Sequence, residues 1–362
     1  MLFYGSQTES EQDIKDPLIP MRNFPDTLTR IIEKSDLNIN RISQISGISN
    51  TYLIKLLNNK INHPGKDKIA SVLLALNYRI TQINPILAEY DYMPLNPHDI
   101  PEILKNNRKR KFEGRIVPQL DYIYFELAMA ALEAVGGTKI MVKNRPSGIF
   151  LPMELYMMKE FPAEPDDEAA RFLMTFTHEI VMERKALFME NCTRGFRYET
   201  YMCKDCLEES LEKNIGPHAV DASPAKQDLF TRYFANAVSA SLKFPDQQLH
   251  RVIKRCARFE FIIQDAHGKN PKVSFTSDRK HSYSHNWEEL TMEGFLSNAP
   301  EITDLFFNEV EKCRNVVEET ASINTPEGFH AYIRSLFDAH DIGRQFDLAL
   351  AELMEYQGLK LY

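Results

Sequence analysis

Side chains that can form hydrogen bonds are concentrated between residues 49 and 60, at a spacing that places them on one face of a short helix. Leu53, Leu56 and Leu57 form an apolar stripe on the opposite side. The outward side chains are Ser49, Asn50, Thr51, Tyr52, Lys55 and Asn59. These groups are mostly uncharged and rich in hydrogen-bonding atoms. They therefore suit contact with base edges in the major groove of double-stranded DNA.

The residues of this face are predicted to have different roles. Asn50, Thr51, Tyr52 and Lys55 are expected to contact bases or phosphates. Ser49 is expected to cap the helix, because a serine hydroxyl accepts a hydrogen bond from a backbone N–H of the first helical turn. Three further residues are expected to contact the phosphate backbone, namely Asn40, Arg41 and Lys60.

A preceding helix must hold this face in place. Ile42 and Ile45 lie three residues apart and therefore share one side of a helix. Gly47 permits the positive φ of a tight turn, and Ile48 is expected to point inward between the two helices. The pattern predicts a helix-turn-helix. The alternative is an ordinary helical hairpin inside a larger α-helical domain.

The order of residues across this unit matches that of a known family at Ile42, Ser43, Gly47 and Ile48-Ser49, and the family's closing Asn-Gly-Lys appears here as Asn58-Asn59-Lys60. In these positions the chain resembles the phage repressor/Cro-type regulators, the xenobiotic-response-element family of bacteria. It departs from the family pattern at Ser46, where a large apolar residue is usual, and at Asn59, where glycine is usual. The resemblance covers about residues 24–92, and it implies a five-helix DNA-binding domain.

The distribution of charge agrees with one domain that meets phosphates. The whole chain carries a formal charge of −8 at pH 7, which argues against a protein that coats nucleic acid along its entire surface. Residues 21–115 contain 15 Lys/Arg against 9 Asp/Glu, so the acidic excess lies in the remainder. A positive N-terminal part on an acidic body is the expected arrangement.

Length and composition predict a domain order for the 362 residues. We expect a flexible tail over 1–23, a helix-turn-helix domain over 24–92, a basic linker over 93–117 and a dimerisation or effector-sensing domain over 118–362. The basic run 105–111 within the linker has two interpretations, an arm that grips phosphates or a solvated connector.

The fold class is expected to be mainly α, with a larger, mostly helical C-terminal domain and minor β-hairpins. Helices are predicted over 120–135, 166–190, 198–213, 225–242, 246–256, 287–296, 299–320, 326–338 and 341–357. One hairpin is predicted from 139–142 and 148–151, and a second strand pair from 259–263 and 272–275. No apolar run is long enough to span a membrane, and the N-terminus lacks the order of a signal peptide.

Cysteine and histidine side chains could instead bind a metal ion or carry out redox chemistry. Cys203 and Cys206 form a Cys-x-x-Cys, and with Cys192 and a histidine, His178 or His218, they could hold zinc or form a redox pair. The spacing lacks the second pair of ligands of the recurring zinc modules, so we interpret these cysteines as small hydrophobic residues and predict no metal. The odd count of five cysteines excludes a full disulfide framework and favours a cytoplasmic location.

Other patterns typical of enzymes are incomplete or absent. His178-Glu179 begins like a zinc-protease helix, but Met182 stands where the second histidine belongs. His281 and His285 lie near Trp287 in an expected surface loop. The sequence contains no phosphate-binding glycine loop and no Gly-x-Ser-x-Gly elbow. We therefore predict no enzyme activity and no cofactor.

The function predicted from the sequence is that of a DNA-binding transcriptional regulator. A unit of this size reads one half-site, so we expect a homodimer on a palindromic operator. The aromatic and methionine stripe of residues 122–132 is interpreted as core, although it could line a pocket for a small-molecule or peptide effector. Two alternatives remain, a protein-interaction module of the antitoxin or antirepressor kind and an enzyme that its helix-turn-helix brings to DNA.

Overall fold

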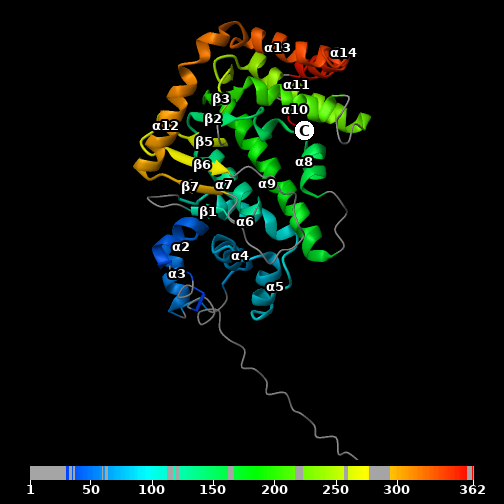
Figure 1. Cartoon of the computed structure of the whole chain (residues 1–362). Helices are drawn as coiled ribbons and strands as arrows, with labels where there is room; N and C mark the ends of the chain where they lie inside the picture. The colour runs from blue at the N-terminus through cyan, green and yellow to red at the C-terminus, as the bar shows by residue number, and fades with distance from the viewer. Residues whose placement is uncertain are drawn as a thin grey trace, which may run out of the picture.

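Helices make up most of the chain and surround one mixed β-sheet (Figure 1). This computed structural model describes residues 30–31, 35, 37–58, 60–61, 64–111, 117–119, 122–161, 167–216, 223–256, 260–276, 294–356 and 361. The predicted tail over 1–23, Asn59 and the segment from His281 to Trp287 lie outside these residues. Within the described chain, no helix is both long and apolar enough to cross a lipid bilayer.

Short helices form the N-terminal end of the molecule. They are α2 (Ile39–Ser46), α3 (Asn50–Leu57), α4 (Lys66–Ala75) and α5 (Ile80–Ala88). Arg30 and Ile31 are also helical, at the place where a first helix is expected. After the 3-10 turn η1 (Pro97–Asp99), helix α6 (Ile100–Asn107) leads towards the body. Each helix buries one apolar stripe, such as Ile42 and Ile45 of α2.

Among the described residues, the sheet has seven strands in the order β1-β7-β6-β5-β2-β3-β4. Strands β2, β3 and β4 run parallel to one another, and the other pairs are antiparallel. The bounds are β1 (Val117–Gln119), β2 (Lys139–Lys143), β3 (Tyr198–Cys203), β4 (Gln248–Ile253), β5 (Glu260–Gln264), β6 (Lys272–Thr276) and β7 (Gly294–Ser297). Because parallel neighbours need long crossovers, helices connect β2 to β3 and β3 to β4.

Longer helices cover this sheet. Those before and between the parallel strands are α7 (Tyr122–Val135), α8 (Met153–Glu160), α9 (Glu168–Thr193), α10 (Lys204–Ile215) and α11 (Pro224–Lys243). The chain ends with α12 (Pro300–Arg314), the 3-10 segment η3 (Val317–Ile323), α13 (Pro326–Asp338) and α14 (Gly343–Met354).

The two faces of the sheet contribute to separate cores. Ile140 and Val142 of β2 point to a cluster with Phe306 and Val310 of α12. Met141, which lies between them, points to the other face and a larger cluster with helices such as α11, α13 and α14. This alternation follows from the two-residue period of a strand. The sheet is therefore the middle layer between two helical layers.

Several expected elements differ from the observed ones. The strand pair predicted near 259–263 and 272–275 is confirmed, since β5 and β6 are antiparallel partners. The hairpin with 148–151 is wrong, because η2 (Gly148–Phe150) is a 3-10 turn and β2 pairs with β3 and β5. The helices predicted over 198–213 and 246–256 are wrong where β3 and β4 lie. The segment predicted as a linker, 93–117, contains the packed helix α6.

The apolar core of the N-terminal helices continues into the body. Ile42, Leu53 and Leu104 belong to the same buried cluster as Leu127 of α7 and Phe176 of α9. Figure 1 shows α9 extending from the upper helices down to the region of α5 and α6. Helices α2 and α3 and the body therefore share apolar packing.

Two buried ion pairs lie where α7, α9 and the sheet meet. Lys139 of β2 pairs with Glu133 of α7, and Arg184 of α9 pairs with Glu126 of α7. The Tyr198 hydroxyl also donates to Glu133 Oε2 at 3.2 Å. Burial lowers the pKa of Lys139, and the charge of Glu133 opposes that shift. Each charge depends on its partner, because an unpaired buried charge is costly.

We expect Lys139→Met to lower the free energy of unfolding by about 3–5 kcal/mol, since it leaves the Glu133 carboxylate buried without its cation. The double variant Lys139→Met/Glu133→Gln should recover part of this loss, because it removes the stranded charge and keeps an oxygen acceptor for Tyr198. Denaturant unfolding of both variants measures the difference. A single variant as stable as the original chain would contradict this interpretation of the pair.

Candidate nucleic-acid interface

Capping side chains mark the starts of helices α2 and α3, and a glycine turn separates the two. The Asn38 side chain accepts a hydrogen bond from the Arg41 N–H at 2.9 Å, at the start of α2. Gly47 ends α2 with a φ of 71°, the left-handed conformation that glycine adopts without strain. Ser49 then caps α3 by accepting from the Tyr52 N–H at 3.2 Å. These contacts agree with the predicted order of helix, turn and second helix.

The turn at Gly47 also has no room for a side chain. A Cβ atom at this position would lie 1.9 Å from the backbone oxygen of Asn106 and 3.3 Å from the Cβ atom of Lys109. The end of α6 therefore packs directly against the turn between α2 and α3. Gly47 is required both by its positive φ and by this close approach.

Ser46, which departs from the family pattern, has a hydrogen-bonding role in the turn. It is 2% exposed, and its hydroxyl accepts from the Ile48 N–H at 3.2 Å. The Ser43 hydroxyl donates to the Ile48 carbonyl at 2.6 Å. Two serines thus satisfy both backbone groups of Ile48, a residue that is itself buried. Ser46 replaces apolar bulk with a local bond that fixes the turn.

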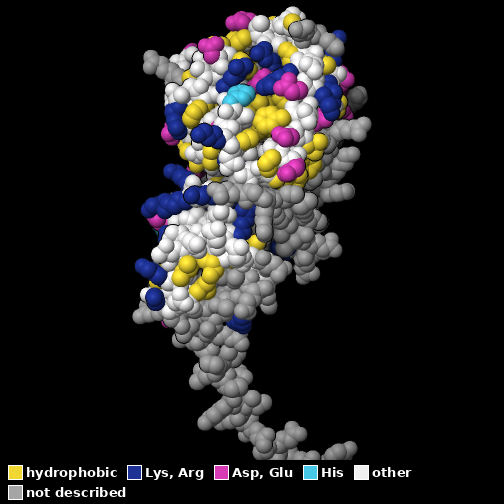
Figure 2. All heavy atoms as spheres, turned by 90° about the vertical axis from the view of Figure 1, so that its left-hand side faces the viewer, with side chains coloured by type: hydrophobic (Ala, Val, Ile, Leu, Met, Phe, Trp, Pro, Cys, Tyr) yellow, Lys and Arg dark blue, Asp and Glu magenta, His cyan; other side chains and the backbone are white. Residues whose placement is uncertain are grey.

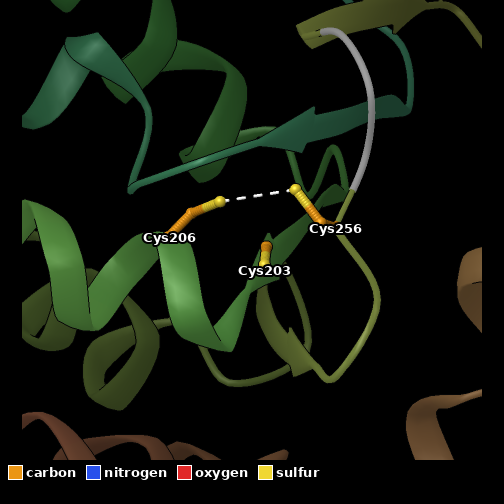
Figure 3. A group of neighbouring side chains, drawn as sticks. All are labelled: Cys203, Cys206 and Cys256. Carbon is orange, nitrogen blue, oxygen red and sulfur yellow. Dashed lines mark hydrogen bonds between the residues drawn. The ribbon is translucent and has the colours of Figure 1, made fainter.

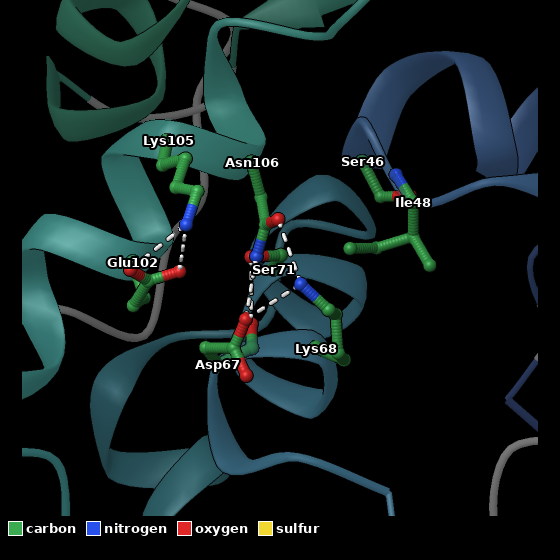
Figure 4. A network of polar contacts seen from close by, with 8 residues as sticks. All are labelled: Ser46, Ile48, Asp67, Lys68, Ser71, Glu102, Lys105 and Asn106. Carbon is green, nitrogen blue, oxygen red and sulfur yellow. Dashed lines mark hydrogen bonds and ion pairs between the residues drawn. The ribbon is translucent and has the colours of Figure 1, made fainter. Parts of the chain in front are cut away.

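A partly buried polar network joins α4 to α6 (Figure 4). Asn106 Nδ2 donates to Asp67 Oδ2 at 2.9 Å and to Ser71 Oγ at 3.2 Å. Lys68 Nζ donates to Asn106 Oδ1 at 3.0 Å and lies 2.8 Å from Asp67 Oδ2. Burial raises the pKa of Asp67, but the hydrogen bonds from Lys68 and Asn106 outweigh this and leave the pKa below its usual value. Asp67 therefore remains ionised at neutral pH.

Further contacts fix α6 and its C-terminal extension to the rest of the protein. Asn107 Nδ2 donates to the Leu127 carbonyl of α7 at 2.8 Å. Arg108 Nε pairs with Glu183 Oε1 of α9 at 2.7 Å. The Lys111 N–H donates to the Gln44 carbonyl of α2 at 2.7 Å. The basic run 105–111 is therefore a packed connection between the body and helix α2 rather than an extended arm.

The predicted contact residues divide into three groups. The exposed side chains are Asn40, Ser49, Asn50, Thr51, Lys55 and Lys60. Tyr52 is half-buried, and Arg41 is 8% exposed. Asn59 lies outside the described residues. Most of the polar face expected from the sequence is therefore open to solvent.

Tyr52 and Arg41 differ from their expected roles as outward contacts. Tyr52 packs against the N-terminal core, where burial raises the pKa of its hydroxyl and a hydrogen bond from the backbone of Gly65 opposes the shift. Arg41 Nη1 donates to Gln44 Oε1 at 3.2 Å within α2. Both side chains support the helix pair.

Four exposed lysines surround the helix pair. Lys55 lies on α3 and Lys60 just after it, while Lys109 and Lys111 follow α6 beside the turn and α2. The described part of the chain places no carboxylate in an ion pair with any of the four, whereas Lys105 pairs with Glu102. The sequence alone indicates only that Lys109 and Lys111 belong to the basic run. It does not predict that they lie beside α2, because this position depends on the packing of α6.

Ile54 adds an apolar side chain to the same exposed helix. It is 44% exposed and lies next to Lys55. Figure 2 views the side of the molecule on which α2 and α3 lie, and it shows an apolar patch in the lower part with Lys and Arg side chains beside it. Ile54 is not among the contact residues predicted from the sequence. The face therefore offers hydrogen-bonding, cationic and apolar groups together.

A small cavity lies between α2, α4, α6 and α7. It has a volume of about 20 Å³, and its lining includes Ser46, Asn107 and Arg110. Burial lowers the pKa of Arg110 to about 10, and the nearby charge of Arg41 contributes in the same direction. This volume holds about one water molecule and is far below that of a ligand pocket.

The cysteines are grouped differently from the sequence expectation. Cys203 and Cys206 lie next to Cys256, which was not among the candidates. Cys192 is buried in the main core, where Gln248 Nε2 donates to its sulfur atom at 3.1 Å. Cys192 is therefore not part of this group. Among the described residues, Cys203, Cys206 and Cys256 form the group of side chains that could hold a metal ion.

Comparison with known proteins gives no relative: no family model, no curated protein and no solved structure matches the chain.

We expect Gly47→Ala to destabilise the protein by more than Gly195→Ala. Gly195 also has a positive φ, of 81°, but a Cβ atom there would meet no atom within 4 Å. The Gly195 variant should therefore cost only the left-handed conformation, about 1–2 kcal/mol. Gly47→Ala should lower the stability by this amount and by the further cost of displacing α6. Equal midpoints of denaturant unfolding for the two variants would show that α6 does not press on the turn.

Proposed function

We propose that the protein is a sequence-specific DNA-binding transcriptional regulator that inserts α3 into the major groove. The observation that carries the proposal is the solvent-exposed face of Asn50, Thr51 and Lys55, on a capped helix held against α2 by the Gly47 turn. A short helix presented in this way fits the width of the major groove. Asparagine can form two hydrogen bonds with adenine, which makes Asn50 the leading residue for base recognition.

Side chains on and around α3 can also contact phosphates and the apolar surface of bases. Lys55, Lys60, Lys109 and Lys111 are exposed cations that can approach phosphates on either side of the helix. Ile54 can contact the methyl group of a thymine. Phosphate contacts position a protein on the duplex and base contacts specify the sequence, so both are expected here.

The proposal includes a homodimer and control through the C-terminal body. One helix-turn-helix reads one half-site, and two copies related by a two-fold axis would read a palindrome. Control by an effector or a protein partner is supported by the shared packing: α6, α7 and α9 contact the helix-turn-helix core. A change in the body that moves these helices would alter the spacing between the two α3 helices. Titration of candidate effectors against operator affinity tests this part, and the absence of any coupling would leave a constitutive regulator.

Asn50→Ala is expected to relax the base preference at one position of the selected DNA site by about 1–3 kcal/mol, because a base-edge hydrogen bond is lost. Selection of sites from a random DNA pool, followed by affinity measurements on single-base variants of the best site, gives this number. Asn315→Ala is the matched control, since Asn315 is an exposed asparagine at the end of α12. Unchanged preference in the Asn50 variant would remove this face from recognition.

Lys60→Ala is expected to weaken binding to all DNA sequences by a similar factor and to lower the slope of log affinity against log salt by about 0.9, the value for one phosphate contact. Lys109→Ala should act in the same direction if the end of α6 borders the DNA. Lys269→Ala is the control, an exposed lysine in the turn between β5 and β6. A capture of a protein partner without DNA, together with no measurable DNA affinity, would instead favour the interaction-module alternative.

A further inference from the structure

Three cysteine side chains meet at one end of the parallel strands, far along the chain from the helix-turn-helix (Figure 3). Cys203 is the last residue of β3 and directly precedes α10, and Cys206 lies in the first turn of that helix. Cys256 follows β4, whose Ile253 pairs with Cys203 in the sheet. Parallel pairing therefore brings the third cysteine to the other two across about 50 residues of sequence.

The distances between the sulfur atoms suit one shared ion. All three Sγ atoms lie within 4.8 Å of one another, and those of Cys206 and Cys256 are 3.5 Å apart. Two thiolates bound to tetrahedral zinc, with Zn–S bonds of about 2.3 Å, lie about 3.8 Å apart. Only small side-chain rotations separate the observed arrangement from that geometry.

The surroundings of the cluster favour metal entry, although burial and the neighbouring thiols raise the pKa of Cys206. Cys203 is buried, Cys206 is partly exposed and Cys256 is exposed, so an ion can reach the sulfur atoms from solvent. Cys203 and Cys206 also lie at the N-terminal end of the twelve-residue helix α10, where the helix dipole stabilises negative charge. Among the described residues the group consists of cysteines alone, a soft donor set that selects thiophilic ions over Mg²⁺ or Ca²⁺.

We propose that Cys203, Cys206 and Cys256 form a binding site for a thiophilic metal ion of the Zn²⁺ class, with three thiolate ligands and a fourth position open to water or another donor. Binding replaces three S–H protons by metal–sulfur bonds and involves no change of oxidation state. The bound ion would connect the start of α10 to the segment after β4. This site is independent of the proposed DNA contacts.

The test uses the full chain, reduced and treated with a chelator, and then titrated with Co²⁺ as a spectroscopic probe for Zn²⁺. We expect one Co²⁺ per chain with a thiolate-to-metal charge-transfer absorption, and displacement of that absorption by Zn²⁺. Cys256→Ser should weaken binding by more than about tenfold, since loss of a direct ligand exceeds the 10–100-fold cost typical of outer-shell changes. Cys256 is exposed, so this variant should fold, and circular dichroism checks this.

Cys313→Ala is the matched control, because Cys313 lies in the α12 core outside the group. It should bind Co²⁺ as the original chain does. Equal binding by the Cys256 variant, or no charge-transfer absorption in the reduced chain, would overturn the proposal. If the reduced chain takes up no metal and mild oxidation lowers its mass by two hydrogens through a Cys206–Cys256 bond, the cluster is a redox pair and the metal site is refuted.

Discussion

The contact between the end of α6 and the Gly47 turn is the constraint on which the candidate interface depends. The Asn106 carbonyl occupies the space that a side chain at residue 47 would need. The same asparagine bonds α4 through Asp67 and Ser71, and its neighbour Asn107 bonds α7. One short helix thus fixes both the angle between α2 and α3 and the position of this pair on the body. The bonds of α6 to Ser71 and to the Leu127 carbonyl are buried, and buried polar groups tolerate little displacement.

The sequence predicted the local features of this interface because their signals are local. Ser49 caps α3 within three residues of itself, and Gly47 marks the turn by its own backbone conformation. The apolar spacing of α3 likewise determines that Leu53 and Leu56 are buried. Such signals do not depend on where the rest of the chain lies. They were sufficient to identify the helix pair and most of its exposed face.

The features that the sequence missed depend on distant partners. Strand β3 is buried on both faces and therefore lacks the alternation that identifies a half-exposed strand. Arg41 and Tyr52 are polar residues whose burial follows from packing against other helices. Cys256 joins Cys203 only because β4 lies parallel to β3. Each case required the three-dimensional order of elements that lie far apart along the chain.

The shared core between the N-terminal helices and the body has a consequence for how the chain acquires its structure during synthesis. Ile42 and Leu53 are made early, but Phe172 and Phe176, which complete their cluster, follow more than a hundred residues later. At a translation rate of roughly 5–20 residues per second, the early helices wait on the order of ten seconds for these partners. The part of their apolar surface that Phe172 and Phe176 cover stays exposed on the ribosome for that time. The nascent N-terminal segment is therefore a natural client for chaperones that bind exposed hydrophobic stretches.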